Sequence, residues 1–218
     1  MERVAVYTAI YGGYDTLREQ PEMPGVDFVC FTDDPGLRSS QWRVVHAKSR
    51  YDHPRMSAKW FRMHPHKVLP EHRRTVWVDG GVQILSSDFA DVVLEAMSPD
   101  GLSLFRHPVR DTAMAEAEFC VPIKKYAGQP MVEQVAHYRA KGFPDESGLW
   151  ATGVIGRDNL RSIRRLGRLW MRENVRWTYQ DQLSLPYLLW RLGIEPGTIP
   201  AGLWDETLIG MVGHTSDL

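Results

Sequence analysis

Short apolar runs of β-forming residues alternate with helical segments along the whole chain, and this alternation limits the fold more than any other feature. The clearest runs cover residues 4–10, 27–32, 75–78, 102–105 and 148–156. Such alternation is typical of βαβ units, whose crossover helices cover both faces of a parallel sheet. We therefore predict an α/β fold with a mostly parallel central sheet flanked by helices. No break in composition divides the chain, so residues 1–218 are expected to form a single domain.

The composition argues against several functions. The chain has 26 Lys and Arg residues against 27 Asp and Glu residues, a formal net charge of -1, which does not support the coating of nucleic acid. No run of about 18 consecutive apolar residues is present and the first residues enter a predicted strand, so no integral membrane segment is expected. Cys30 and Cys120 lack a C-x-x-C spacing and are predicted to be buried thiols. We expect a soluble, cytoplasmic protein.

The stretch 75–85 is the predicted centre of the functional site. Two β-type runs meet there at Asp79, Gly80 and Gly81. Glycines let the backbone bend and allow a ligand to approach closely. A carboxylate at the end of a buried strand is a typical ligand for a phosphate-bound cation. Asp79 is therefore the first candidate for the active site.

Two other predicted strands end in residues with two open interpretations. The first strand runs into Tyr11, Gly12 and Gly13. These residues either face a ligand or form an ordinary turn, since no G-x-G-x-x-G is present. Asp33 follows the second strand and could accept a hydrogen bond from a nucleobase or a ribose. An acid shortly before Pro and Gly is an equally good turn residue.

The densest group of ionisable residues follows the strand at 102–105. Arg106, His107 and Arg110 could hold an anionic or hydroxylated ligand. A solvated loop would have the same composition. We favour the binding role, because the group again stands at the carboxyl end of a strand.

Three basic residues share one side of the helix predicted after residue 53. Asp52 is its expected N-cap, and a proline stands in its first turn. Arg55, Lys59 and Arg62 lie away from the apolar stripe of this helix. They form either a solvated basic face or a row that points Lys59, together with Arg55, at phosphate groups.

Two later helices also leave alternatives open. In the helix that begins near residue 159, arginines lie off the apolar stripe. They either touch an anionic surface or belong to an ordinary surface helix packed on the sheet, which we favour. Asp181 stands at the start of the last helix, where capping and the helix dipole alone would favour an acid.

Five short motifs follow one another at residues 6–15, 30–33, 77–80, 105–108 and 180–182. In this order they resemble a glycosyltransferase-like family once catalogued as a domain of unknown function, whose plant members are linked to seed mucilage and turgor regulation. The order of a helix, a D-x-D-like segment, Thr152-Gly153 and a late His214 is also similar to that of glycogenin and the lipopolysaccharide galactosyltransferases. The resemblance implies a GT-A-like fold with a Rossmann-like nucleotide-binding half.

The resemblance implies roles in nucleotide binding for several residues. Thr8, Ala9 and Tyr11 would line the nucleotide. Asp33 would lie near its base or ribose, and Lys59 would meet the diphosphate.

The resemblance also implies a divalent cation, Mn²⁺ or Mg²⁺, held by Asp79 and His214. One departure matters, because Gly81 stands where a D-x-D motif has its second acid. Either Asp79 and His214 suffice with phosphate and water as further ligands, or the enzyme is metal-independent and basic residues neutralise the leaving group. These basic residues would be Lys59, Arg106 and Arg110.

The sugar and the acceptor would meet a second set of residues. The catalytic candidates are Asp181, Arg106 and His107. The remaining substrate contacts would come from Gly153, Gln182 and Arg110.

These roles lead to the hypothesis of a glycosyltransferase of the hexosyltransferase class, with a UDP-sugar as expected donor and a small molecule or glycan as hydroxyl acceptor. The glycogenin-like order favours retention of configuration. One alternative is a hydrolase acting on a lipid amide, an activity assigned to a plant relative, although neither G-x-S-x-G nor H-E-x-x-H is present. The other is a non-catalytic nucleotide-sugar binding module, which the glycine in the D-x-D-like segment keeps open.

Overall fold

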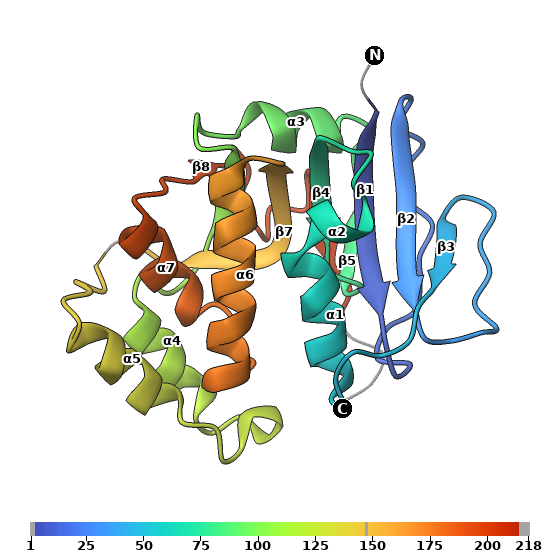
Figure 1. Cartoon of the computed structure of the whole chain (residues 1–218). Coiled ribbons are helices and arrows are strands. Elements are labelled where there is room, and N and C mark those ends of the chain that lie inside the picture. The colour runs from blue at the N-terminus through green and yellow to red at the C-terminus, as the bar shows by residue number, and fades with distance from the viewer. Residues whose placement is uncertain (1–2, 147, 214–218) are drawn as a thin grey trace.

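The computed structural model describes residues 3–146 and 148–213 and has the predicted α/β architecture (Figure 1). The strands of this part of the chain are β1 (Val4–Ile10), β2 (Val26–Thr32), β3 (Arg43–His46), β4 (Arg74–Val78), β5 (Val82–Ile84), β6 (Leu102–Arg106), β7 (Trp150–Asp158), β8 (Gly197–Thr198) and β9 (Ile209–Met211). The helices are α1 (Pro54–Met63), α2 (Pro65–Val68), α3 (Phe89–Glu95), α4 (Ala113–Cys120), the 3-10 helix η1 (Lys124–Tyr126), α5 (Met131–Arg139), α6 (Arg161–Arg176) and α7 (Ser184–Leu192).

The described strands form a seven-stranded sheet in the order β3-β2-β1-β4-β7-β6-β8 and a separate pair of β5 with β9. The pairs β3·β2, β2·β1, β1·β4 and β6·β8 are parallel. The mostly parallel sheet that the sequence predicts is therefore confirmed. The glycine-rich strand β7 runs the other way and pairs antiparallel with both β4 and β6. Its first half therefore lies at the edge where the parallel strands end.

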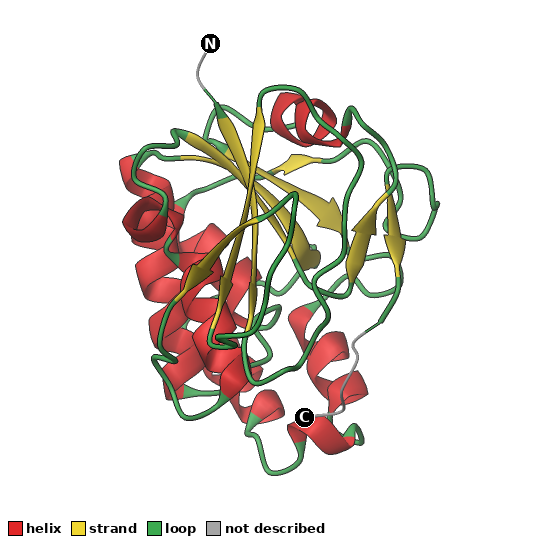
Figure 2. Cartoon of the chain, turned by 90° about the vertical axis from the view of Figure 1, so that its right-hand side faces the viewer, coloured by secondary structure: helices red, strands yellow, loops and turns green. Residues whose placement is uncertain are grey.

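Helices cover one face of the sheet, and a smaller layer covers the other (Figures 1 and 2). Because side chains alternate along a strand, Tyr7 of β1 belongs to the core beneath α1, α6 and α7. Its neighbour Val6 belongs to the core shared with α3 and the β5·β9 pair. Burial on both faces explains why the strands are almost continuously apolar.

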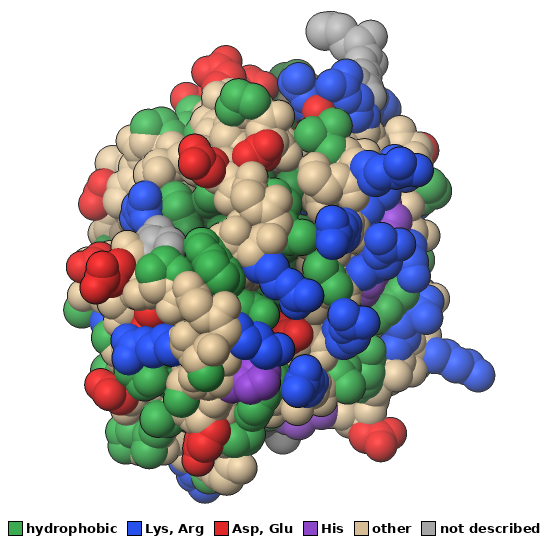
Figure 3. Space-filling model, turned by 60° about the vertical axis from the view of Figure 1, so that its left-hand side comes forward, with side chains coloured by type: hydrophobic (Ala, Val, Ile, Leu, Met, Phe, Trp, Pro, Cys, Tyr) green, Lys and Arg blue, Asp and Glu red, His purple; other side chains and the backbone are tan. Residues whose placement is uncertain are grey.

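Helix α6 has the pattern of an ordinary surface helix. Ile163, Leu166 and Trp170 are buried against the molecule. The exposed arginines of this helix are Arg161, Arg164, Arg165, Arg168, Arg172 and Arg176. Figure 3 shows Lys and Arg side chains gathered in a band on one side of the face it displays. The favoured interpretation of this helix, packing on the core through its apolar stripe, agrees with these positions.

Helix α1 starts differently from the prediction. Its N-cap residue is His53, not Asp52, and no side chain caps it. Pro54 occupies the first turn, and its ring presets the helical backbone angle without requiring a capping hydrogen bond. The expected cap at Asp52 was therefore wrong by one position.

Two simpler expectations concern thiols and membranes. Cys30 and Cys120 are free and buried, as predicted. Within the described part of the chain, no helix combines the length and the apolar character needed to cross a bilayer. A cytoplasmic location stays a prediction.

Candidate active site

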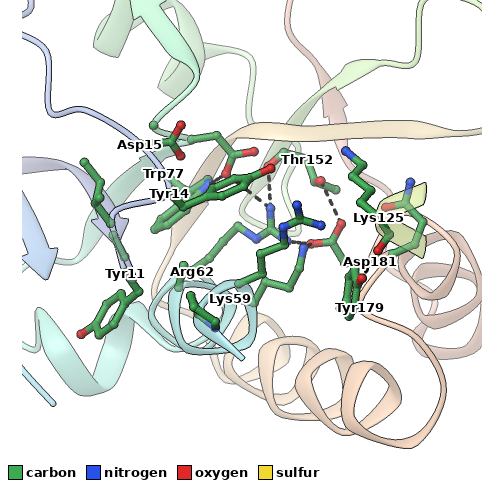
Figure 4. A pocket seen from close by; sticks show the side chains of 18 of the residues that line it. Tyr11, Tyr14, Asp15, Lys59, Arg62, Trp77, Lys125, Thr152, Tyr179 and Asp181 are labelled. Carbon is green, nitrogen blue, oxygen red and sulfur yellow. Dashed lines mark hydrogen bonds and ion pairs between the residues drawn. The ribbon is translucent and has the colours of Figure 1, made fainter. Parts of the chain in front are cut away.

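A pocket of about 220 Å³ opens at the carboxyl edge of β1 and β4. We call it the strand-edge pocket. Its walls come from the β1 loop, α1, η1, the start of β7 and the segment before α7. Figure 4 shows the labelled residues Tyr11, Trp77 and Asp15 on one side, Lys125, Tyr179 and Asp181 on the other, and Lys59 and Arg62 between them.

The β1 loop is fixed against the start of α1. Gly12 has a positive φ of 61°, a conformation that glycine adopts easily. A Cβ atom at Gly12 would lie 2.6 Å from Cγ of Pro54. The Gly12 amide also donates to Oδ1 of Asp33 over 3.0 Å. This close packing keeps Tyr14, further along the loop, at the wall of the pocket.

Asp79 follows β4 directly and is one-third exposed, with 33% of its side chain accessible. Its backbone amide donates to the carbonyl oxygen of Gly153 over 2.8 Å. Oδ1 accepts from Nε1 of Trp77 at 2.6 Å and lies 3.5 Å from Nη1 of Arg62. Oδ2 has no hydrogen-bond or ion-pair partner among residues 3–146 and 148–213.

Asp181 is the buried centre of an ion-pair network, with 3% of its side chain exposed. Oδ2 accepts from Nζ of Lys59 at 2.7 Å, and the same carboxylate pairs with Arg62. Oδ1 accepts from the Thr152 hydroxyl at 3.2 Å. Burial, reinforced by the neighbouring Arg62 guanidinium, holds the pKa of Lys59 well below its ordinary value. The network joins α1, β7 and the segment before α7 at the base of the pocket.

The pocket brings together many of the residues selected from the sequence. These are Ala9, Tyr11, Lys59, Asp79, Asp181 and Gln182. Gly153 lies next to Asp79, and its carbonyl oxygen accepts a hydrogen bond from the Asp79 backbone amide. His214 lies outside the described residues.

Two residues assigned to the nucleotide lie elsewhere. Thr8 is buried and lines a small hollow beside the strand-edge pocket, together with Asp79. Asp33 lines a shallow hollow at the ends of β2 and β3. Its carboxylate accepts from the Gly12 amide and from Oγ of Ser49, the latter over 3.2 Å. In this structure Asp33 holds the β1 loop in place.

Arg106, His107 and Arg110 do not line the strand-edge pocket. Arg106 lies over the Trp150 ring, 4.0 Å from its centroid. Arg110 pairs with the buried Glu116, and His107 lies 3.7 Å from the same carboxylate. Burial lowers the pKa of His107.

Glu116 connects this group to the pocket. Its Oε1 accepts from Nε2 of Gln180 at 2.8 Å, and Gln180 lines the pocket next to Asp181. His107 and Arg110 are therefore placed to position Gln180 rather than to touch a ligand in the pocket.

Sequence reasoning left several lining residues out of the predicted site. They are Tyr14, Asp15, Arg55, Arg62, Lys125, Tyr126, Thr152, Tyr179 and Gln180. The sequence suggests Arg55 only as one alternative, beside Lys59, and Arg62 could have been included because it shares a helix face with both. The sequence holds no signal for Lys125 or Tyr126, since their place depends on how η1 folds over the pocket.

Asp15 lies beside Asp79 because Gly80 leaves it room. A Cβ atom at Gly80 would come within 2.6 Å of Oδ2 of Asp15. Desolvation is the main reason why the pKa of Tyr14 is raised, and the charges of Asp15 and Asp79 raise it further. The lining thus contains three acids, Asp15, Asp79 and Asp181, and four bases, Arg55, Lys59, Arg62 and Lys125. Such a lining suits an anionic ligand that also carries hydroxyl groups.

A mostly parallel α/β sheet with a charged pocket at its carboxyl edge agrees with the expected GT-A-like fold. The model of one family, described as TOD1/MUCI70, glycosyltransferase-like domain, matches residues 1–201. The chain belongs to this family, and the resemblance drawn from the five motifs is confirmed. No curated protein matches the chain. At the level of the family, the function is of the glycosyltransferase type, with a sugar donor and an acceptor.

Proposed function

We propose that the protein transfers a sugar from a nucleoside diphosphate sugar, with a UDP-sugar as the expected donor, to a hydroxyl group of a small molecule or glycan. The observation that carries the proposal is the strand-edge pocket itself, in which basic side chains of α1 face carboxylates from β4 and from the segment before α7. Membership of a glycosyltransferase-like family supports the same reaction class.

The pocket residues match the demands of the reaction. Negative charge develops on the diphosphate as the bond to the sugar breaks, so groups that stabilise this charge in the transition state accelerate transfer. Lys59 and Arg62 are fixed by Asp181, which keeps their positive charges in place before the ligand arrives. Holding the acceptor hydroxyl close to the sugar supplies much of the remaining rate.

A divalent cation is a separate part of the prediction. Oδ2 of Asp79 has no partner among the described groups, and Asp15 lies nearby, but Arg62 competes for Asp79. Among the side chains that the structure describes, no group of three or more His, Cys, Asp and Glu residues is arranged to hold a metal ion. We assign no catalytic step to a cation. Binding of Mn²⁺ or Mg²⁺ by Asp79 and His214 remains a prediction.

Titration of the protein with UDP and GDP tests the proposal, followed by assays of UDP release from a panel of UDP-sugars with hydroxyl acceptors. We expect a nucleoside diphosphate to bind, and Lys59→Met to weaken binding about 10-fold or more because it removes a charge from the pocket. Lys141→Met is the matched control, since Lys141 is exposed and does not line the pocket. Failure of every nucleoside diphosphate to bind would contradict the proposal.

The same assays separate the alternatives. A binding module with no catalysis would bind the nucleotide sugar without turning it over with any acceptor. A lipid amide hydrolase would cleave ceramide without needing a nucleotide sugar. We favour transfer over both because the family match is to a glycosyltransferase-like domain.

A further inference from the structure

The four basic residues of the strand-edge pocket fall into two pairs. Lys59 and Arg62 both contact the Asp181 carboxylate, and Arg62 also contacts Asp79. Arg55 and Lys125 form no ion pair with a carboxylate of the described residues. The positive charge of the pocket that no described carboxylate pairs with is therefore concentrated on Arg55 and Lys125.

Arg55 occupies a position that is unfavourable without an anion. It is the second residue of α1, whose first turn contains no acidic residue. A positive side chain at a helix N-terminus opposes the helix dipole, whereas an anion there is stabilised. The guanidinium lies over two rings, 4.7 Å from the centroid of Tyr14 and 5.7 Å from that of Tyr179. These aromatic contacts orient it without neutralising it.

Unmet hydrogen-bond donors point to a ligand at the same place. Nε of Arg55 and Nε of Arg62 are buried and have no hydrogen-bond partner among the described groups. The Arg62 side chain is only 4% exposed. A buried donor without an acceptor is costly, so an acceptor that binds in the pocket gains from both arginines.

Lys125 adds a second positive charge from a different element. It belongs to η1 and lines the exposed rim of the pocket. Desolvation, and next the nearby Arg55 guanidinium, lower the pKa of Lys125. The two cations repel each other in the free protein, and an anion with at least two negative charges between them would remove this repulsion.

Resting on the proposed function, we infer that Arg55 and Lys125 bind the diphosphate of the donor directly, so that the nucleotide binds equally well without a divalent cation. The two residues take over the charge compensation that a D-x-D-bound metal ion supplies elsewhere. This agrees with the glycine at position 81 and with the contacts of Asp79, whose Oδ1 is engaged by Trp77 and Arg62.

Isothermal titration of the full chain with UDP, in excess EDTA and then in excess Mn²⁺, tests the inference. We expect dissociation constants that agree within about 3-fold, and competition by inorganic pyrophosphate. Arg55→Gln and Lys125→Met should each raise the dissociation constant about 10-fold or more in EDTA, because each removes a charged donor to phosphate. Lys124→Met is the matched control, since this exposed neighbour in η1 does not line the pocket.

The outcomes distinguish the inference from the proposed function. A requirement for Mn²⁺, or unchanged affinity in both variants, overturns the inference and leaves the proposed function standing. Absence of UDP and GDP binding under both conditions contradicts the proposed function as well. Because Lys125 is exposed, its substitution is expected to leave the fold intact, and thermal unfolding of both variants checks that they remain folded.

Discussion

Asp181 is the residue on which the charge balance of the strand-edge pocket depends. It is buried and contacts two cations, Lys59 and Arg62. Breaking a buried ion pair by removing one partner is strongly destabilising, because the remaining charge stays buried and unpaired.

We expect Asp181→Asn to lower the free energy of unfolding by about 3 kcal/mol. Asp79→Asn should lower the free energy of unfolding by less, since Asp79 is one-third exposed and its carboxylate lies 3.5 Å from Arg62. Urea unfolding of the two variants and the wild type measures both values. Equal losses would show that the network does not depend on the Asp181 charge.

His64 gives the fold a pH dependence outside the pocket. The residue is 4% exposed, its Nδ1 lies 2.9 Å from the Trp60 carbonyl oxygen, and burial lowers its pKa from 6.5 to about 4. The unfolded chain therefore binds this proton more readily than the folded protein does. The stability contributed by neutral His64 is complete above pH 6.5 and is lost as the pH falls towards 4.

His64→Gln should remove this part of the acid sensitivity. Between the two pKa values, the wild type should lose about 2 kcal/mol more than the variant, allowing for solvent screening. Urea unfolding at a series of pH values measures the difference. Parallel curves for the two proteins would contradict the assignment.

Part of the site was predictable from the residues that follow the predicted strands, for a geometric reason. Asp79 and Tyr11 end neighbouring parallel strands, so their side chains had to lie at one edge of the sheet. The same reasoning does not tell whether a side chain enters the pocket or binds its own protein, as Arg110 does with Glu116. Lys125 carried no signal, because no sequence pattern predicts which loop folds over a pocket.

At the scale of elements, the packing of α1 on α6 holds the basic residues in place. The two helices touch at Gly167, where a Cβ atom would lie 2.0 Å from the Met63 carbonyl oxygen. Nothing larger than glycine fits without moving a backbone.

Gly167→Ala should therefore destabilise the protein by about 2 kcal/mol, as overpacking in a core typically does. The shift of α1 should also weaken nucleotide binding through Lys59. Ser162→Ala, at an exposed position of the same helix, should change stability by no more than about 0.5 kcal/mol. Thermal unfolding and UDP titration measure both effects, and a fully stable Gly167→Ala protein would mean that the helices are not in contact there.

The elements themselves were largely predictable, because hydrophobic periodicity depends on local geometry. The direction of β7 was not. A glycine-rich apolar strand buried on both faces has the same pattern whether it runs parallel or antiparallel to its neighbours. The start of α1 was misplaced because Asp52 and His53 both precede the proline, and only the backbone angles decide between them.

At the scale of the whole molecule, one sheet separates two cores. Alternate side chains of β1 enter opposite cores, so neither core can be lost while the sheet remains intact. A single domain for residues 1–218 stays a prediction, and unfolding experiments can test it.

We expect one cooperative unfolding transition. Tryptophan fluorescence and far-ultraviolet circular dichroism should give the same midpoint in urea, as two-state unfolding requires. Trp170 lies in one core and Trp42 in the other, so the fluorescence reports on both. Two separate transitions would contradict a single domain.

The three basic residues of α1 also fix the depth of the pocket. Arg55 stands near the rim and Arg62 at the base, seven positions apart on one uninterrupted helix, which corresponds to roughly 10 Å along the axis. Because the helix is rigid, the distance between these two residues cannot change to suit a longer or shorter ligand. We therefore expect discrimination between ligands of different length at the opposite wall, where the short η1 turn carries Lys125 and has no fully buried residue.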